Sequence, residues 1–327
     1  MTKIIGIGNA LVDVLIHLED ETLLQKLHLP KGGMTLIDEG QLTAINNATA
    51  HLPRHRATGG SASNTIHALA SLGDNVGFIG SVGDDETGRF FRQQAESRGI
   101  ETHISTVSGM ASGIATTFIT PDSERTFATH LGAATQVVPL DDFPAIIRQQ
   151  STSQDILHIE GYLVQDHHLI EHLLREAKAA GMQVSYDLAS WNIVASDRPF
   201  IQHLVADYVD FVFANEEEAA AFSGQLDPEV ALQMLAEQTS VAVVKVGKRG
   251  ALGCYNGNKA FAPGLVRKVV DTTAAGDFFA AGFLHGWVHG QPLDRCLDYG
   301  NRIAGEVIQV VGTQVTANRL QAALQSS

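Results

Sequence analysis

The sequence predicts a doubly wound, three-layer α/β/α domain built on a mainly parallel β-sheet. Three observations lead to this fold class. Short apolar runs recur along the chain, and segments with helical periodicity separate them. These runs are continuous rather than alternating, which is typical of parallel strands that helices cover on both faces. The chain has 327 residues, 44% of them apolar, so residues 1–327 are long enough to bury a sizeable core as one domain.

Six apolar runs are predicted to form the central sheet. In chain order they are Ile4–Gly8, Val76–Ile79, Ile156–Ile159, Val184–Tyr186, Phe211–Phe213 and Val241–Val246. The helices predicted between them are Ser63–Leu72, Glu86–Arg98, Asp166–Ala180, Glu216–Phe222 and Pro228–Glu237. After these, the chain is predicted to be helical from Ala274 to about Val311.

Two regions depart from this rhythm and are predicted to form a small antiparallel β-sheet over the main domain. Residues about 11–40 and about 102–130 contain strand-like segments with little helix between them. Their Ser and Thr content suits a sheet with one solvated face. Because a sheet over a cleft excludes water from a reaction, we interpret these insertions as a lid. The candidate strands are Val12–Leu18, Met34–Ile37, Ile104–Val107 and Ile114–Thr120.

The charge of the chain argues against binding to nucleic acids or to anionic membranes. The sequence has 22 Lys and Arg residues against 36 Asp and Glu, a net charge of −14. No run approaches the ~18 apolar residues of a membrane span. Asn9 and Asp13 interrupt the apolar N-terminus, so we expect no signal peptide. Cys254 and Cys296 form no disulfide or zinc pattern, which favours the cytoplasm.

The segment Val270–Leu284 carries the strongest chemical signal. Ala274, Ala275 and Gly276 are small enough for a tight turn, and the apolar residues after Asp277 predict a buried helix. Free amides at the N-terminus of such a helix, together with its dipole, attract an anion. Asp277, in the first turn, would accept a proton from a hydroxyl group presented to that anion. The alternative is an ordinary N-terminal aspartate beside packing residues.

A second segment, Thr58–Asn64, places two glycines before another predicted helix. Gly60 would let a ligand approach the backbone, and the Asn64 amide offers both a donor and an acceptor. An ordinary loop and helix cap would explain the same residues.

Together these segments resemble the two signatures of the ribokinase-like (PfkB) family of sugar and nucleoside kinases. The resemblance spans nearly the whole chain, and the motifs occur in the family's order. Ala274 stands where many members have glycine, although ribokinases commonly carry alanine there. The matching segments are Gly59–Asn64, Val82–Gly88, Asn215–Glu218, Val244–Gly250 and Asp271–Asp277.

This resemblance implies an enzyme that transfers the γ-phosphate of ATP to a primary hydroxyl group. Asp277 would be the catalytic base, and the turn Ala274–Gly276, through the amides of Ala275 and Gly276, would form the anion hole. The nucleotide phosphates would lie beside a strand, a turn and the start of the anion loop. The residues expected there are Lys245, Gly247, Gly250 and Thr272.

The resemblance also implies metal ions. Asn215 and Glu218, one helical turn apart, would orient Mg²⁺ through water molecules. The alternative for Glu216–Glu218 is a solvated acidic helix start. In the family, a monovalent cation such as K⁺ is common near the carbonyl groups that correspond to Asp271 and Thr273.

The resemblance further implies that the acceptor binds at Asp13, Gly60 and Asn64, because an aspartate at the position of Asp13 binds sugar hydroxyl groups in the family. A carboxylate accepts two hydroxyl donors at once, as a diol requires. Arg125 corresponds loosely to a family arginine between lid and core, where it would neutralise transferred phosphate. A surface ion pair with Glu124 or Asp122 is the alternative for Arg125. Among the aromatic residues, Tyr162 and Trp191 are candidates to stack on a purine, with Phe118 and Phe127.

Three segments are similar to adenosine-kinase-like members of the family: Gly8–Asp13, Lys31–Leu36 and His158–Leu163. Ala274 instead favours a ribokinase. We therefore expect a nucleoside such as adenosine as the acceptor, with ribose, fructose and 2-keto-3-deoxygluconate as alternatives. Members of the family can dimerise through their lid sheets, so a homodimer is a further expectation.

Competing motifs are weaker. The chain has no Walker loop, and Leu11 stands where a dinucleotide-binding motif needs its third glycine. His168–His172 matches a His-x-x-Glu-His pattern of zinc hydrolases, so a zinc hydrolase is one alternative function. A non-catalytic regulator on the same fold is another. The presence of Asp277, Asn215 and Glu218 argues against the regulator.

Overall fold

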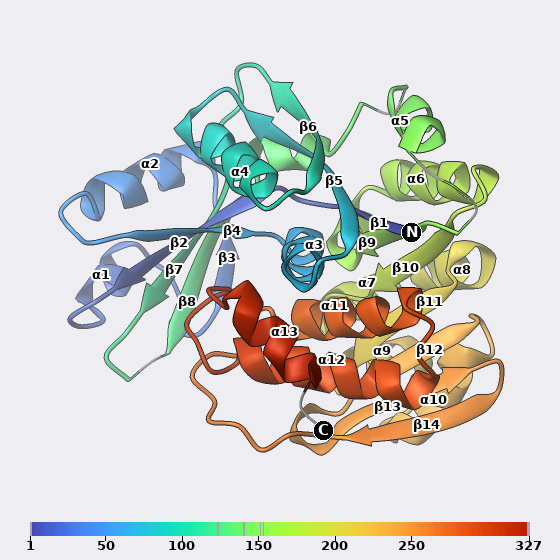
Figure 1. The fold of residues 1–327 in the computed structure, drawn as a ribbon. Helices are drawn as coiled ribbons and strands as arrows, with labels where there is room; N and C mark the ends of the chain where they lie inside the picture. The colour runs from blue at the N-terminus through green and yellow to red at the C-terminus, as the bar shows by residue number, and fades with distance from the viewer. Residues whose placement is uncertain (1, 123, 140, 151, 153, 326–327) are drawn as a thin grey trace.

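The computed structural model describes residues 2–122, 124–139, 141–150, 152 and 154–325 and contains two β-sheets (Figure 1). The main sheet has nine strands in the order β14-β13-β12-β11-β10-β9-β1-β5-β6. It is parallel from β12 to β6, and an antiparallel hairpin of β13 and β14 extends it. The strands are β1 (Lys3–Ile7), β5 (Asn75–Gly83), β6 (Glu101–Val107), β9 (Ile156–Glu160), β10 (Gln183–Asp187), β11 (Phe211–Asn215), β12 (Val241–Lys245), β13 (Gly250–Tyr255) and β14 (Asn258–Pro263).

Helices cover both faces of this sheet, which confirms the predicted three-layer architecture (Figure 1). Successive residues of a strand point to opposite faces. Phe211 and Phe213 therefore pack into one core, and Val212 and Ala214 into the other. The first core includes α3 (Ser61–Leu72), α4 (Glu86–Ser97), α11 (Ala275–Val288), α12 (Leu293–Val307) and α13 (Ala317–Gln325). The second includes α5 (Phe143–Gln150), α6 (His167–Ala179), α7 (Trp191–Ser196), α8 (Arg198–Tyr208), α9 (Glu216–Ser223) and α10 (Pro228–Ala236).

The second sheet has five strands in the order β3-β8-β7-β2-β4, and it is mixed rather than antiparallel as predicted. The pairs β2–β7 and β3–β8 are parallel, whereas β2–β4 and β7–β8 are antiparallel. The strands β2 and β7 run parallel because each begins beyond the carboxyl end of a main-sheet strand, β1 or β6, and leaves in the same direction. The strands are β2 (Leu11–His17), β3 (Met34–Leu36), β4 (His55–Gly59), β7 (Gly113–Ile119) and β8 (Arg125–His130), with α1 (Thr22–Lys26) and α2 (Glu39–Ala48) between them in the chain.

The predicted lid segment 102–130 divides between the two sheets. The candidate lid strand Ile104–Val107 is part of β6, which pairs with β5 at the edge of the main sheet. An edge strand is only partly covered, so its pattern alternates and is similar to that of a half-solvated lid strand. Conversely, the lid sheet contains a strand that lies outside the predicted insertions, β4, which pairs with β2.

The C-terminal region, predicted as one helix, is broken between α11 and α12. Gly290 has a left-handed φ of 71°, and Pro292 caps the start of α12. Proline has no amide hydrogen and cannot sit inside a helix without disturbing it. The break lets the two helices pack against each other. No helix in the described part of the chain is long and apolar enough to cross a membrane.

The strand order reverses at β1, which has β5 on one side and β9 on the other. Doubly wound sheets bind ligands at such a switch point, beyond the carboxyl ends of the strands. At this edge the chain places Asn9, Glu160, Asp187, Asn215 and Lys245. The fold thus brings polar side chains from five separate strands or their ends to one rim.

Candidate active site

A cavity of about 940 Å³ lies between this rim, the lid sheet and the N-terminus of α11. Its size is within the range of about 300–1,000 Å³ that is usual for small-molecule sites. It brings together most of the residues that the sequence predicts. These are Asp13, Gly60, Asn64, Asn215, Glu218, Lys245, Gly247, Gly250, Thr272, Thr273, Ala274, Ala275, Gly276 and Asp277. Of the predicted set, Arg125 and Asp271 do not line this cavity.

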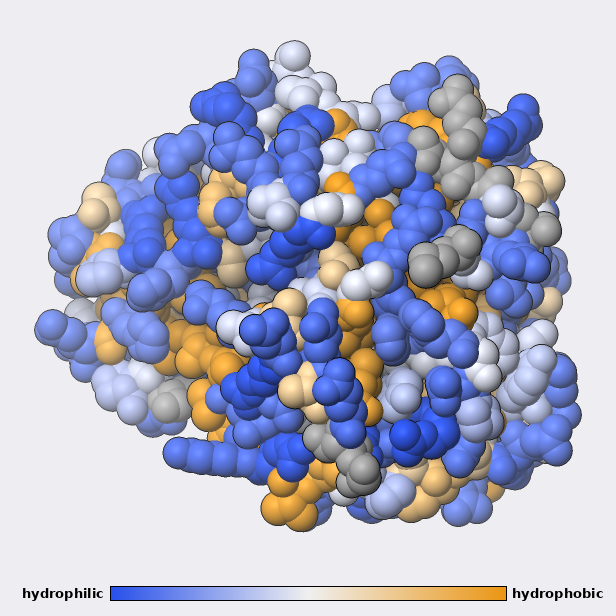
Figure 2. Space-filling view, in the orientation of Figure 1, coloured by the Kyte–Doolittle hydropathy of each residue, from blue (hydrophilic) through white to orange (hydrophobic). Residues whose placement is uncertain are grey.

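Part of the rim of the cavity is apolar. The lining includes Leu265, Val266, Val269, Ala304 and Ile308, from the loop after β14 and from the end of α12. Figure 2 shows a largely hydrophilic face on which most apolar side chains lie in recesses. One hydrophobic patch projects at its lower edge, where Figure 1 draws the loop between β14 and α11. Val266 in this loop is 96% exposed.

The predicted turn at Ala274–Gly276 starts α11. Ala274 is the N-cap and has a left-handed φ of 61°, a conformation that glycine adopts without strain. This explains why glycine is common at the position. The amide of Ala275 donates to the carbonyl oxygen of Thr272 at 3.2 Å, so one of the predicted anion-hole amides already has a partner within the turn.

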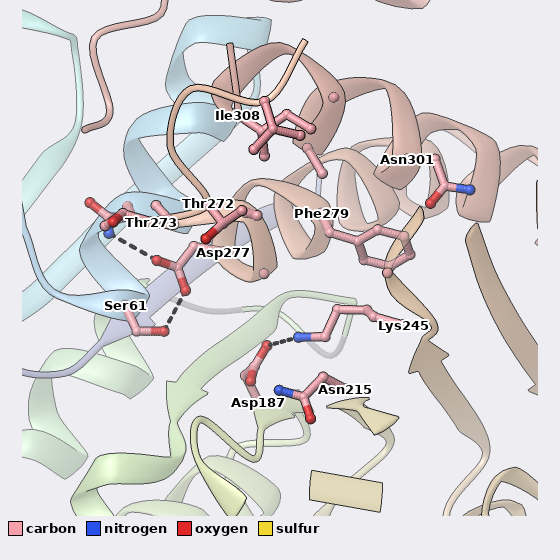
Figure 3. A pocket seen from close by; sticks show the side chains of 18 of the residues that line it. Ser61, Asp187, Asn215, Lys245, Thr272, Thr273, Asp277, Phe279, Asn301 and Ile308 are labelled. Carbon is pink, nitrogen blue, oxygen red and sulfur yellow. Dashed lines mark hydrogen bonds and ion pairs between the residues drawn. The ribbon is translucent and has the colours of Figure 1, made fainter. Parts of the chain in front are cut away.

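Asp277 lies in the first turn of α11, half-buried against the start of α3 (Figure 3). Ser61 Oγ donates to its Oδ1 at 2.7 Å, and Asn64 Nδ2 donates to its Oδ2 at 2.8 Å. Burial raises the pKa of Asp277 to about 7, and the charge of Asp187 adds to the rise. The two hydrogen bonds and Lys245 oppose it. The side chain is thus poised to exchange a proton near neutral pH.

Asp13, on β2 of the lid sheet, lines the same cavity. Burial and the charge of Asp271 raise the pKa of its carboxyl group to about 7, while Arg125 lowers it. Next to it, Gly60 caps α3 with a φ of 90°, and a Cβ there would overlap the carbonyl oxygen of Asn9. Only glycine fits this close approach, which holds the start of α3 beside β2.

Asn215 and Glu218 form a reciprocal capping box at the start of α9. Asn215 Oδ1 accepts from the Glu218 amide at 2.8 Å, and Glu218 Oε2 accepts from the Asn215 amide at 2.7 Å. A third bond joins Asn215 Nδ2 to Glu218 Oε1 at 2.7 Å. Glu218 is only 4% exposed, so the alternative of a solvated helix start is wrong for this residue. Burial chiefly raises its pKa to about 7, with a further rise from Asp187 and a lowering by Lys245.

Lys245 ends β12 and forms an ion pair with the buried Asp187, at 3.0 Å between Nζ and Oδ2 (Figure 3). Burial lowers the pKa of Lys245, but the carboxylates of Asp187 and Glu218 outweigh it, so the net shift is upward and the amine stays charged. A Cβ built on Gly276 would lie 3.1 Å from Lys245 Nζ. The ammonium group therefore lies beside the N-terminus of α11.

Arg125 and Asp271 meet behind the anion loop rather than in the cavity. Arg125 Nη1 lies 2.5 Å from Asp271 Oδ2 and donates to Thr273 Oγ1 at 2.9 Å. Asp271 also accepts from the amides of Thr273, at 2.9 Å, and Gly312, at 2.5 Å. Neither Glu124 nor Asp122 is the partner, so the expected surface ion pair of Arg125 is wrong. Arg125 instead ties lid strand β8 to the loop before α11.

Two acidic residues of this region were not predicted from the sequence. Asp187 lines the cavity, and Glu160 lies beneath its edge, 1% exposed. The carboxylate of Glu160 accepts from the amides of Asn9, at 2.9 Å, and Ala62, at 3.0 Å, and also from the Asn9 side chain. Both residues end a strand that was predicted from its apolar run. Their position at a carboxyl edge was the signal that could have identified them.

The other sequence candidates lie elsewhere. His168, Glu171 and His172 are on α6, where Arg175 Nη2 lies 3.1 Å from His172 Nδ1. They are not among the side chains that form a potential metal-binding group in the described residues. Of the aromatic candidates, Tyr162 lines the cavity, Phe118 is fully buried, and Phe127 and Trp191 lie outside the lining.

A doubly wound, mainly parallel sheet with a strand-built lid over a cavity is the architecture of the sugar and nucleoside kinases. The chain belongs to the pfkB family of carbohydrate kinases, because residues 46–319 match the model of that family. It is thus a phosphotransferase that uses ATP and has an alcohol group as acceptor.

Known proteins are similar over three quarters of the chain or more. An adenosine kinase from Dictyostelium discoideum is 27% identical, with 97% of each chain covered. An ATP-dependent ribose-1-phosphate kinase from Halopiger xanaduensis is 30% identical over 76% of this chain and 79% of its own. The crystal structure of adenosine kinase from Sinorhizobium meliloti is 30% identical, with a TM-score of 0.83 and coverage of 99% and 98%. These similarities confirm the predicted family and fold.

Proposed function

We propose that this chain phosphorylates the primary hydroxyl group of a nucleoside, adenosine in the first place, with Asp277 as the base. The observation that carries the proposal is the position of Asp277, in the first turn of α11 and inside the cavity that Asp13 also lines. A base with a pKa of about 7 is half ionised at neutral pH and can accept the hydroxyl proton as the oxygen attacks phosphorus.

The transferred phosphate is proposed to lie against the N-terminus of α11 and Lys245. The ammonium group lies beside the helix N-terminus, so it and the helix dipole would act on the phosphate together, and both are fixed before the ligand arrives. Gly247 and Gly250, in the turn after β12, leave room for the remaining phosphates, with Thr272 on the other side. The apolar rim formed by Leu265, Val266, Val269, Ala304 and Ile308 suits the purine ring of ATP.

The residues present fit a magnesium ion. Asp187, Glu218 and Asp277 surround a single ammonium group, that of Lys245, and two of these carboxyl groups have pKa values raised to about 7. A divalent cation among them would relieve this surplus of negative charge, and oxygen ligands are those that Mg²⁺ prefers. When bound, Mg²⁺ would neutralise charge on the phosphates. We assign Asn215 and Glu218 to its hydration shell, because their mutual hydrogen bonds fix their direction.

The acceptor is proposed to bind between the lid and α3. Asp13 would receive two ribose hydroxyl groups, and Asn64, already bonded to Asp277, would place the reacting hydroxyl beside the base. Arg125 would act indirectly by holding the loop that contains Thr273. Tyr162, which lines the cavity, is available to pack against the acceptor. Adenosine is preferred because Gly8–Asp13 and His158–Leu163, which supply Asp13 and Tyr162 to the cavity, are similar to adenosine-kinase-like members, as is Lys31–Leu36 on the lid sheet. Ribose, fructose and 2-keto-3-deoxygluconate are the alternatives.

Three further expectations accompany this proposal. The carbonyl groups of Asp271 and Thr273 would bind K⁺, since the Asp271 side chain is occupied by Arg125 and two amides. A homodimer would pair the lid sheets at edge strand β3, where Met34 and Leu36 are 57% and 53% exposed. Small molecules rather than nucleic acids or membranes would be the ligands, in the cytoplasm, where the buried Cys254 and Cys296 stay reduced.

The experiment that tests the proposal is ADP release from MgATP in a coupled assay across nucleosides, pentoses, hexoses and keto-deoxy sugars. We expect the highest kcat/KM with adenosine, and no acceptor-dependent ADP with Asp277→Asn. A preference for ribose or a keto-deoxy sugar would overturn the choice of acceptor but keep the kinase. ADP release from wild type and Asp277→Asn at equal rates would overturn the role of the base.

A further inference from the structure

A cluster of metal-binding side chains lies at the opposite end of α11 from the cavity. It consists of Asp74, in the turn between α3 and β5, and of His285 and His289 at the end of α11. Each residue offers one ligand atom, and these atoms all lie within 4.8 Å of one another. We propose that this cluster binds a divalent cation with affinity for imidazole, such as Zn²⁺.

The three residues are already held together. Asp74 Oδ2 lies 2.8 Å from His285 Nδ1, and Asp74 Oδ1 lies 3.6 Å from His289 Nδ1. The two imidazole rings have centroids 4.4 Å apart. Tetrahedral Zn²⁺ with ligand bonds of about 2.1 Å needs neighbouring ligand atoms about 3.4 Å apart. Since one ligand atom of each residue already lies within 4.8 Å of the other two, small side-chain rotations would bring them into place.

The surroundings of the cluster also suit a metal. The Asp74 side chain is only 2% exposed, so its carboxylate is fixed in the protein, whereas His289 is 52% exposed and leaves an entry from solvent. His289 Nδ1 lies 2.8 Å from the carbonyl oxygen of His285. A metal-binding histidine commonly makes such a bond with one ring nitrogen, which leaves the other, Nε2, unprotonated as the donor. Three protein ligands leave the fourth position for water or an external group.

The chain contains a comparison within itself. His168 and His172 on α6 have the same spacing of four residues and lie on one helix face. The His-x-x-Glu-His pattern identified in the sequence contains that pair. In the described residues, however, no third ligand atom groups with the α6 pair, whereas Asp74 lies between the α11 pair. The distinguishing feature is the carboxylate from a distant turn, which the linear sequence does not show.

This site is separate from the proposed kinase site. None of its residues lines the cavity, and His285 lies eight residues after Asp277, about 12 Å along the helix at about 1.5 Å per residue. A bound ion would join the end of α11 to the turn after α3, and so stabilise the packing of these two helices. The proposal does not depend on which acceptor the enzyme phosphorylates.

The test is metal binding by the full chain without a histidine tag, in the presence of excess Mg²⁺ to occupy the oxygen-lined cavity. Zn²⁺ is titrated against a chromophoric chelator, and Co²⁺ is used to detect the visible bands of a tetrahedral site. We expect one tight equivalent and tetrahedral bands in wild type. His289→Asn and Asp74→Asn should each weaken Zn²⁺ binding by at least ~10-fold. The double variant His168→Asn, His172→Asn should bind as wild type does.

Equal Zn²⁺ affinity in wild type and His289→Asn would overturn the proposal and leave the cluster as a hydrogen-bonded junction. An equal loss in the α6 double variant would also overturn it, because binding would then be a general property of surface histidines. Since His289 is exposed, its variant is expected to fold even if Asp74→Asn does not. As a second readout, Zn²⁺ should raise the Tm of wild type but not that of His289→Asn.

Discussion

Asn64 and Asp277, 213 residues apart in the chain, share a hydrogen bond of 2.8 Å at the floor of the cavity. The bond joins the first turns of α3 and α11, the two helices whose start signals were the strongest in the sequence. It fixes the orientation of the carboxylate that we assign as the base. It also lowers the pKa of that carboxylate against the effect of burial.

This relationship predicts the pH dependence of the reaction. The base must be ionised, so kcat/KM should rise with pH through a midpoint near 7, the pKa of Asp277. Asn64→Ala removes a hydrogen bond that favours the ionised form, so the midpoint should move to higher pH. The measurement is kcat/KM against pH for both proteins. An Asn64→Ala profile with an unmoved or lower midpoint would contradict the proposed coupling.

Asp13→Ala should weaken binding of the acceptor while leaving ATP binding unchanged. Two hydroxyl bonds to a charged acceptor contribute about 2–4 kcal/mol. Isothermal titration calorimetry with the preferred acceptor substrate measures the loss of affinity directly. Asp13→Asn keeps one side-chain oxygen that accepts hydrogen bonds, so its affinity should lie between those of wild type and Asp13→Ala. Unchanged affinity in Asp13→Ala would remove this residue from the acceptor site.

Glu218→Gln should raise the Mg²⁺ concentration that gives half-maximal rate by about 10-fold. Glutamine also serves at this position of a capping box, so the two reciprocal backbone bonds at the start of α9 should persist, while the charge and the bond from Asn215 Nδ2 are lost. Glu217→Gln, at the adjacent exposed position, is the matched control. If both variants show the wild-type Mg²⁺ titration, Glu218 only caps the helix.

Ala274→Gly should stabilise the protein, although glycine usually weakens a structure. Ala274 has a φ of 61°, where an L-residue with a Cβ costs about 1–2 kcal/mol. Part of this gain is offset by the greater freedom of glycine in the unfolded chain, so we expect a net increase of about 0.5–1 kcal/mol. Ala275→Gly, at the first position of the helix, should instead lose up to about 1 kcal/mol. Urea denaturation measures the free energy of unfolding of the two variants and of wild type. Equal destabilisation of both variants would contradict the prediction for Ala274→Gly.

The sequence predicted the parallel strands and the anion loop well because both depend on local signals. Apolar runs between helical segments located the parallel strands except β6, and small residues before an apolar helix located the start of α11. The antiparallel hairpin was missed although its signal was present. Asn256 and Gly257, both with positive φ, form the turn between β13 and β14, and Asn-Gly is a strong hairpin signal.

Other features depend on contacts between distant segments and could not be predicted in this way. The pairing of Lys245 with Asp187 requires β10, β11 and β12 to lie side by side, which no local pattern specifies. β4 has the sequence His55-Arg-Ala-Thr-Gly59, with little β propensity, and becomes a strand because β2 offers it a free edge. Arg125 is close to Asp122 and Glu124 in the chain, yet the fold pairs it with Asp271.

The measurement that tests the account most directly is the rate of phosphoryl transfer by Asp277→Asn, compared with wild type at saturating MgATP and acceptor. Asparagine keeps the shape of the side chain but cannot accept the proton. We predict a fall in kcat of at least ~10²-fold, with ATP affinity within about twofold of wild type. A variant that binds ATP normally and retains wild-type turnover would contradict the assignment of Asp277 as the base.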